Sequence, residues 1–303
     1  MRIVLALGGN ALLRRGEPME AEVQRRNLLA AVSLAIAPIA RKHEVVVTHG
    51  NGPQIGLLAL QAAAFKDTQP YPLDVLGAES EGMIGYLIEQ ALAGELSGRE
   101  IATLLTQVEV DAADPAFANP SKPIGPIYAE AEARQIAARM KWTMMPDDGG
   151  YRRAVPSPVP QRIREINVVR LLLKAGVLVI CAGGGGIPVV TTAEGGIRGV
   201  EAVIDKDFSA ALLAEEIAAD VLLLLTDVAG VWPKWPKSEG QPIGRTTPTE
   251  LRRHVFAPGS MAPKVEAACR FVERTGGMAA IGAMEEAEAI LNGRAGTIVS
   301  TRT

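Results

Sequence analysis

The chain opens with Ile3-Val4-Leu5-Ala6-Leu7-Gly8-Gly9-Asn10, five apolar residues followed by two glycines and an asparagine. The apolar run predicts a strand that is buried on both faces of a sheet. Glycine tolerates positive φ and lets a ligand come close to the main chain. The strand therefore presents backbone N–H groups at one sheet edge, where an anion could bind. A tight turn without a ligand gives the same pattern, so the interpretation depends on whether the pattern returns.

The pattern of an apolar run followed by glycines returns twice further along the chain. The apolar run 45–48 leads into His49-Gly50-Asn51-Gly52-Pro53-Gln54, and the run 177–181 leads into four glycines, 183–186. Pro53 suits the first position of a helix, where its missing N–H costs nothing. We therefore expect strand–glycine–helix turns at several points of one sheet.

Apolar residues recur at helical and strand spacings through most of the chain. The expected helices cover about 20–41, 79–96, 163–174, 208–218, 260–275 and 286–291, with another from Pro53, and the expected strands include 101–110, 221–225, 278–283 and 297–300. This alternation predicts an α/β protein, a three-layer α/β/α sandwich around a mostly parallel sheet. Ligands of such folds bind beyond the carboxyl ends of the strands, so the glycine turns should gather there.

The regular pattern is interrupted between residues 114 and 160, where eight prolines alternate with charged residues. Proline cannot occupy a central strand, because it lacks the N–H that the ladder needs. Within the segment, Glu130–Met140 fits one short helix. We expect a small subdomain that protrudes from the sheet and acts as a lid, although a surface embellishment fits the composition too.

The net charge and composition of the 303-residue chain exclude several classes of protein. A net charge of −3 gives no basic field for nucleic acid, and no apolar run approaches the roughly 20 residues of a membrane span. Cys181 and Cys269 lack metal-ligand spacing and are expected in the core, and three scattered histidines do not predict a zinc site. We expect a cytoplasmic protein that has neither nucleic-acid nor membrane partners.

Several common catalytic motifs are missing from the sequence. It contains no Gly-Lys-Ser/Thr of a P-loop, no strict Gly-x-Gly-x-x-Gly and no Gly-x-Ser-x-Gly. Glycine turns and two lysines near loop–helix junctions, Lys206 and Lys264, remain. This set suits phosphoryl transfer, in which catalysis is mostly positioning and cationic stabilisation of phosphate oxygens.

A set of strings spread along the chain resembles the carbamate kinases of the amino acid kinase superfamily. The match covers essentially the whole chain in order and in spacing. The strings are Ala6–Leu12, His49–Gln54, Pro120–Pro126, Ala182–Pro188, Val203–Asp207 and Gly259–Val265.

This resemblance implies a single amino acid kinase domain over 1–303 with two lobes. Lobe 1–215 would hold carbamate and the transferred phosphate and would include the protruding subdomain, about 117–160. Lobe 216–303 would hold the nucleotide. The implied reaction is carbamoyl phosphate + MgADP ⇌ ATP + carbamate, often in arginine breakdown, with Mg²⁺ carried by the nucleotide rather than by a protein metal site. The resemblance also implies a homodimer.

The resemblance implies a role for each matching residue. Lys206 would bind the transferring phosphoryl oxygens, Asp207 would hold Lys206, and Lys122 would close over the phosphate. Lys264 would reach the β and γ phosphates of the nucleotide. The residues expected around carbamate and the phosphoryl group are Gly8, Gly9, Asn10, Gly50, Asn51 and Gly52, and those expected beside the nucleotide are Thr226, Asp227, Met261 and Lys264.

Carbamate is already an anion, so it can attack phosphorus without losing a proton, and no general base is needed. Two other classes of function stay open. One is another amino acid kinase, acting on acetylglutamate, aspartate, UMP or isopentenyl phosphate. The other is a sensor that binds carbamoyl phosphate or nucleotide without turnover, which would be expected to have lost Lys206, Asp207 or Lys264. A scaffold would not need glycine-lined strand ends.

Overall fold

The computed structural model describes residues 1–303 except 15, 66–69, 148, 234–239, 257–260 and 303. The largest of its sheets has eight strands, and every pair within it is parallel except β14 with β15. In spatial order they are β13 (Arg245–Thr246), β15 (Thr297–Val299), β14 (Met278–Ala283), β12 (Val221–Thr226), β1 (Arg2–Leu7), β2 (Glu44–His49), β9 (Leu178–Ile180) and β3 (Ile101–Thr103).

Alternate residues of β1 face opposite sides of this sheet, as the geometry of a strand requires. Val4 and Ala6 pack in one buried cluster, and Ile3, Leu5 and Leu7 pack in the other. The first cluster lies under α6 (Ile166–Lys174), α7 (Lys206–Glu216) and α9 (Met261–Thr275), and the second under α1 (Ala21–Ala31), α2 (Ala37–Ala40), α4 (Leu73–Glu95) and α10 (Ala287–Leu291). The predicted three-layer α/β/α sandwich is therefore confirmed.

A second sheet, separate from the main one, has four strands. Its order is β11 (Ile197–Gly199), β10 (Ile187–Thr191), β4 (Gln107–Val110) and β8 (Pro160–Ile163). The prediction of one strand over 101–110 is wrong, because β3 and β4 belong to different sheets. The chain leaves the main sheet at Thr106, whose carbonyl accepts the N–H of Ile187 at the start of β10.

Several helices also begin at other residues than the sequence predicts. The helix expected over 163–174 begins at Ile166, because Ile163 pairs with Val108 in β8. Helix α4 starts six residues earlier than predicted, at Leu73, and α7 starts at Lys206. The remaining segments are the short helices η1 (Gly9–Ala11), η3 (Pro115–Phe117), η4 (Gly183–Gly185), η5 (Met284–Glu286) and α8 (Pro248–Leu251), the π-helical turn η2 (Val32–Ile36) and α3 (Gly52–Phe65).

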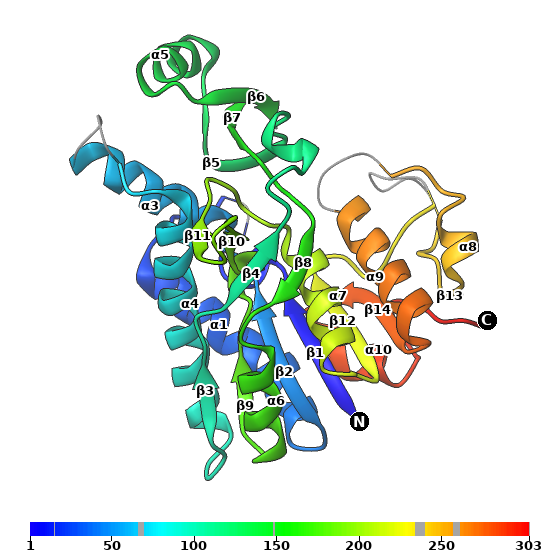
Figure 1. Cartoon of the computed structure of the whole chain (residues 1–303). Helices are drawn as coiled ribbons and strands as arrows, with labels where there is room; N and C mark the ends of the chain where they lie inside the picture. The colour runs from blue at the N-terminus through cyan, green and yellow to red at the C-terminus, as the bar shows by residue number, and fades with distance from the viewer. Residues whose placement is uncertain (15, 66–69, 148, 234–239, 257–260, 303) are drawn as a thin grey trace.

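The proline-rich segment forms a subdomain of its own, which protrudes beyond the carboxyl ends of the central strands (Figure 1). It contains a three-stranded sheet in the order β5 (Lys122–Tyr128), β7 (Gly150–Val155), β6 (Thr143–Asp147), together with α5 (Glu130–Met140). The prolines at 123, 126 and 146 lie in β5 and β6, the two edge strands, as the missing N–H demands.

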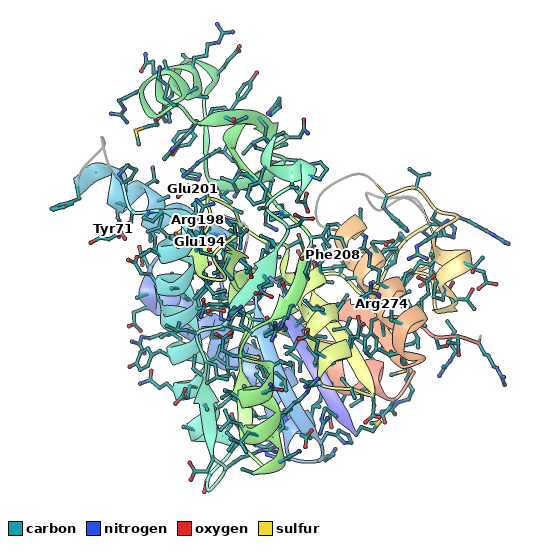
Figure 2. All side chains as sticks on the ribbon, in the orientation of Figure 1. Tyr71, Glu194, Arg198, Glu201, Phe208 and Arg274 are labelled. Atoms are coloured by element: carbon teal, nitrogen blue, oxygen red, sulfur yellow. The ribbon has the colours of Figure 1, made fainter. Side chains whose placement is uncertain are left out.

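A small apolar cluster joins this subdomain to the rest of the chain, with Ile124 and Val155 packed against Ile55 and Val203. A polar link lies beside it. The guanidinium of Arg153 is 3.6 Å from the carboxylate of Glu201, which also accepts the N–H of Leu73 at 2.8 Å. Figure 2 labels Glu201 just below the protruding subdomain. The subdomain is therefore anchored by both apolar and polar contacts.

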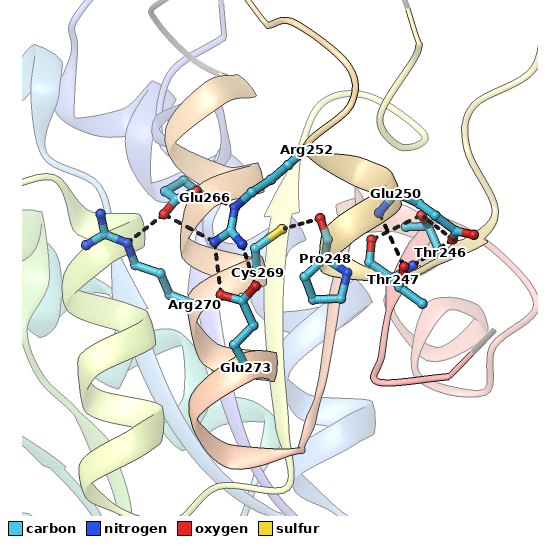
Figure 3. Close-up of polar contacts among 9 residues, drawn as sticks. All are labelled: Thr246, Thr247, Pro248, Glu250, Arg252, Glu266, Cys269, Arg270 and Glu273. Atoms are coloured by element: carbon cyan, nitrogen blue, oxygen red, sulfur yellow. Dashed lines mark hydrogen bonds and ion pairs between the residues drawn. The ribbon is translucent and has the colours of Figure 1, made fainter.

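Beside β13, at one lateral edge of the main sheet, α8 is tied to α9 (Figure 3). Thr247 and Glu250 form a reciprocal capping box at the start of α8. Arg252, just after α8, forms ion pairs with Glu266 and Glu273 of α9. These contacts fix the helix whose first turn carries Lys264.

Cys181 and Cys269 are buried free thiols, as predicted. Among the described residues, no helix combines the length and the apolar composition that crossing a membrane requires.

The close approach of α3 to β5 generates a prediction. A Cβ on Gly56 would lie 2.1 Å from the Cα of Gly125, a backbone atom that cannot rotate away. Gly56→Ala should therefore force the protruding subdomain off α3, cost about 2 kcal/mol and lower Tm. Gly77→Ala in α4 is the matched control, because its Cβ meets nothing within 4 Å. Equal melting of wild type and Gly56→Ala would contradict this packing.

Candidate functional site

The glycine turns lie together at the carboxyl ends of β1, β2 and β9, as predicted. A Cβ on Gly50 would lie 3.3 Å from the amide nitrogen of Gly9 and 3.7 Å from Cδ of Lys206. A Cβ on Gly184 would overlap the side-chain amide of Asn51. Gly184 also has a φ of 66°, which an L side chain adopts only with strain. The close approach of neighbouring atoms thus explains why positions 50 and 184 are glycine.

Asp207 is the centre of the charged groups beside these turns. Its Oδ1 is 2.5 Å from Nζ of Lys206, and its Oδ2 is 3.0 Å from Nζ of Lys264. The three residues are 3%, 9% and 7% exposed, respectively. Two buried ammonium groups therefore share one buried carboxylate.

The pKa values follow from this arrangement. Burial alone would raise the pKa of Asp207, but the two lysines hold it well below its usual range. Burial, aided by repulsion from Lys264, lowers the pKa of Lys206 despite attraction to Asp207. For Lys264, burial acts downward, and attraction to Asp207 outweighs it and raises the pKa. Asp207 is thus an anion whose charge permits two cations to be buried side by side.

The lysines reach this point because each lies in the first turn of a helix. Lys206 is the first residue of α7, and Lys264 lies in the first turn of α9. The string 205–207 starts α7 because Asp205 caps it: its Oδ1 accepts the N–H of Asp207 at 2.9 Å. The third glycine turn is bonded to the same helix, since Ser209 Oγ donates to the carbonyl oxygen of Gly185 at 2.7 Å.

Lys122 approaches the same place from the protruding subdomain. Its Nζ is 2.9 Å from Oδ2 of Asp205. Sequence reasoning did not select Asp205, although an aspartate directly before a helix is a recognisable N-cap signal. The acid therefore contacts both the subdomain and the helix that carries Lys206.

The other predicted residues of the first two turns are placed as follows. Gly8 directly follows β1 and donates its N–H to the carbonyl of Leu225 at 3.0 Å, and Gly52 begins α3. Asn51 is 5% exposed, and its Nδ2 donates to Ser80 Oγ at 2.8 Å. Asn10 belongs to η1, but the position of its side chain lies outside what the structure describes.

The residues predicted beside the nucleotide divide into two kinds. Thr226 and Asp227 lie at the end of β12 and border a cavity of about 290 Å³, together with Gly8 and Arg14. The charge of Asp227 also acts on Lys264. The Met261 side chain is 2% exposed and packs in the core under α7 and α9 instead of lining an open site. Gly259 and Ser260 lie outside the described residues.

Two buried ionisable side chains, Glu81 and His49, lie next to the third glycine turn at Gly183. Glu81 of α4 accepts the N–H of Thr106 at 2.9 Å, and burial raises the pKa of this carboxyl well above its usual range. His49 is 1% exposed, and its Nδ1 lies 3.1 Å from the carbonyl oxygen of Gly50. Burial lowers the pKa of His49 to about 4. The imidazole is therefore neutral at pH 7, and its ring leaves no room for a Cβ at Gly183.

Together the site has three ammonium groups (Lys122, Lys206, Lys264) against two carboxylates (Asp205, Asp207). These five side chains lie beside backbone turns at the carboxyl ends of parallel strands, and Asp227 adds a further negative charge that acts on Lys264. Such a site favours an anion with several oxygens, and low solvent access strengthens each interaction. Transfer of a phosphoryl group between two bound anions is the chemistry that this arrangement supports.

Burial of His49 predicts a pH dependence of stability. Its pKa is about 4 in the folded chain, against 6.5 for a solvated histidine, so the unfolded chain takes up a proton first as the pH falls. About 3 kcal/mol of stability is therefore lost between pH 6.5 and pH 4. Melting temperatures across this range should fall less steeply for His49→Gln than for wild type. The control His43→Gln alters a much less buried histidine whose pKa burial also lowers, so it should change the slope less than His49→Gln does. Equal slopes for wild type and His49→Gln would disprove the assignment.

Comparison with known proteins agrees with this chemistry. Residues 1–281 match the model of the amino acid kinase family. The chain is 53% identical to the carbamate kinase of Rhizobium meliloti (strain 1021) over 99% of its own length and 94% of that protein's. It is also 53% identical to the carbamate kinase of Haemophilus influenzae, over 100% and 98% of the two chains.

Solved structures give the same result. Carbamate kinase from Giardia lamblia bound to AMP-PNP is 39% identical and superposes with a TM-score of 0.89, covering 99% of this chain and 98% of that one. UMP kinase from Bacillus anthracis, with a TM-score of 0.54 at 15% identity, shares the fold alone. The chain therefore belongs to the amino acid kinase family, and within that family it is a carbamate kinase.

Proposed function

We propose that the chain transfers the phosphoryl group of carbamoyl phosphate to MgADP, giving ATP and carbamate, at the cluster of Lys206, Asp207 and Lys264. The observation that carries this proposal is the pair of buried ammonium groups sharing one carboxylate beside the glycine turns. The same residues serve the reverse reaction.

In this proposal each lysine binds a different part of the reacting system. Lys206, which lies against Gly50, binds the transferring phosphoryl oxygens, and Lys264, on whose pKa Asp227 acts, reaches the nucleotide phosphates. Asp207 holds both ammonium groups in place. The turns 8–10 and 50–52 surround carbamate and the phosphoryl group, although the N–H groups of Gly8 and Gly50 are already bonded to the carbonyls of Leu225 and Leu7.

The cluster is built for charge stabilisation, not for proton abstraction. Asp207 is held as an anion by two lysines, and His49 is buried. Carbamate carries its own negative charge, so it can attack phosphorus without losing a proton. The protein's task is to bring two anions together, and the ammonium groups of Lys122, Lys206 and Lys264 reduce their repulsion.

For the nucleotide we propose lobe 216–303, with Thr226 and Asp227 bordering it and Met261 beside it through its backbone. The Giardia enzyme binds the ATP analogue AMP-PNP, which supports an adenine nucleotide here. Thr226 and Asp227 offer oxygen donors, which suit Mg²⁺, and we propose that this ion is held mainly by the nucleotide phosphates. When bound, it neutralises phosphate charge.

Lobe 1–215 would hold carbamate, and the protruding subdomain, about 117–160, would act as its lid through Lys122. We further propose a cytoplasmic homodimer that acts in arginine and carbamoyl phosphate metabolism. Sedimentation equilibrium measures the oligomeric state directly, and a monomer at micromolar concentration would contradict the dimer.

The activity is tested by incubating purified protein with carbamoyl phosphate and MgADP and following ATP in a coupled assay. Wild type should produce ATP. Lys206→Ala should lower kcat by about 100- to 1,000-fold, because it removes one cation aimed at the charge that develops on the phosphoryl oxygens.

Lys174→Ala is the control, since it removes an exposed lysine at the end of α6 and should keep full turnover. If folded wild-type protein binds ADP but makes no ATP, the proposed reaction is wrong. Acetylglutamate, aspartate, isopentenyl phosphate and UMP would then be tested as acceptors with ATP.

A further inference from the structure

Asp205 links the protruding subdomain to the start of α7. One carboxylate oxygen accepts the N–H of Asp207 at 2.9 Å and so caps the helix. The other accepts a hydrogen bond from Nζ of Lys122 at 2.9 Å. The two contacts use different oxygens, so Asp205 makes both of them at once.

The Lys122–Asp205 ion pair is partly shielded from solvent. The two side chains are 23% and 21% exposed, so solvent screens the pair less than it screens an ion pair on the open surface. The charge of Asp205 also acts on both Lys206 and Lys264. All three lysines of the site therefore face this acid or its neighbour Asp207.

Lysine has a long flexible stem, and ordering it costs conformational entropy. Its ammonium group has three N–H donors, and the contact with Asp205 uses one of them. The others stay available for phosphate oxygens. Asp205 can therefore direct Lys122 without using up its capacity to bind a phosphoryl group.

We propose that Asp205 is a positioning residue that holds Lys122 of the protruding subdomain beside Lys206 and Lys264 before substrate arrives. The phosphoryl group of carbamoyl phosphate then meets a complete set of cations instead of having to order the third one. This inference rests on the proposed function, because it takes Lys122 to be a ligand of that group.

Capping of α7 is a competing explanation for the importance of Asp205, and substitution separates the two roles. Asparagine caps helices as well as aspartate does, but it carries no charge. Asp205→Asn keeps the cap and weakens the hold on Lys122, whereas Asp205→Ala removes both. Comparing the melting temperatures of the two variants reports the cap alone.

The kinetic test is a double-mutant cycle of Asp205→Asn and Lys122→Ala, followed as ATP formation from carbamoyl phosphate and MgADP. Asp205→Asn should lower kcat/KM for carbamoyl phosphate by about tenfold, with a smaller effect on KM for ADP. In the Lys122→Ala background the same substitution should change kcat/KM less than twofold. Additive losses, or a wild-type kcat/KM for Asp205→Asn, would overturn the proposal.

Asp147→Asn is the matched control. It breaks an ion pair of similar exposure, Asp147 with Arg152 at 3.0 Å, which lies wholly within the protruding subdomain. This variant should keep wild-type kinetics, and a tenfold loss would show that any charge removed from the subdomain has this effect.

A second measurement does not depend on catalysis. In ligand-free protein, Asp205→Asn and Lys122→Ala should each speed amide hydrogen exchange in 122–128, and Asp147→Asn should not speed it at the end of β5 that carries Lys122. Unchanged exchange in the first two variants would overturn the inference even if wild type made ATP. Faster exchange together with inactive wild-type protein would instead overturn the proposed function and leave the positioning of Lys122 standing.

Discussion

The site depends on one buried carboxylate. Without Asp207, Lys206 and Lys264 would be two like charges in a region from which water is largely excluded, and neither could stay both buried and ionised at low cost. Because Asp207 is the second residue of α7, the helix, its cap and the packing of α7 on α9 all serve to hold this acid between the two lysines. The two buried positive charges are thus held in place where the first turns of α7 and α9 meet.

The central sheet and its glycine turns could be predicted because they depend on local patterns. The run 3–7 is apolar at every position, so only a strand buried on both faces fits it, and Gly8 and Gly50 follow strands whose parallel direction brings their ends together. The proline-rich subdomain was also predictable, because Pro123 and Pro146 exclude a central strand. Lys206 and Lys264 were candidates because they lie near loop–helix junctions, but a single lysine is more often a surface residue, so their roles, and Asp207, came from the resemblance to carbamate kinases.

Long-range contacts could not be predicted in this way. The change of sheet at Thr106 depends on a bond to Ile187, more than eighty residues away along the chain, and nothing in the apolar run 101–110 indicates it. The pairing of Asp205 with Lys122 likewise depends on how the protruding subdomain docks. Met261 shows a limit of the family resemblance. It belongs to a stretch that resembles carbamate kinases, but its side chain is buried in the core.

The edge strands of the protruding subdomain have a consequence for the behaviour of the protein in concentrated solution. A three-stranded sheet that extends from the body has two edge strands, and an edge that is exposed can recruit a strand of another chain and start aggregation. Pro123 and Pro126 in β5 and Pro146 in β6 remove N–H donors from both edges, and α5 lies beside the sheet. The prolines that make this segment irregular in sequence thus also protect its edge strands from pairing with a strand of another chain.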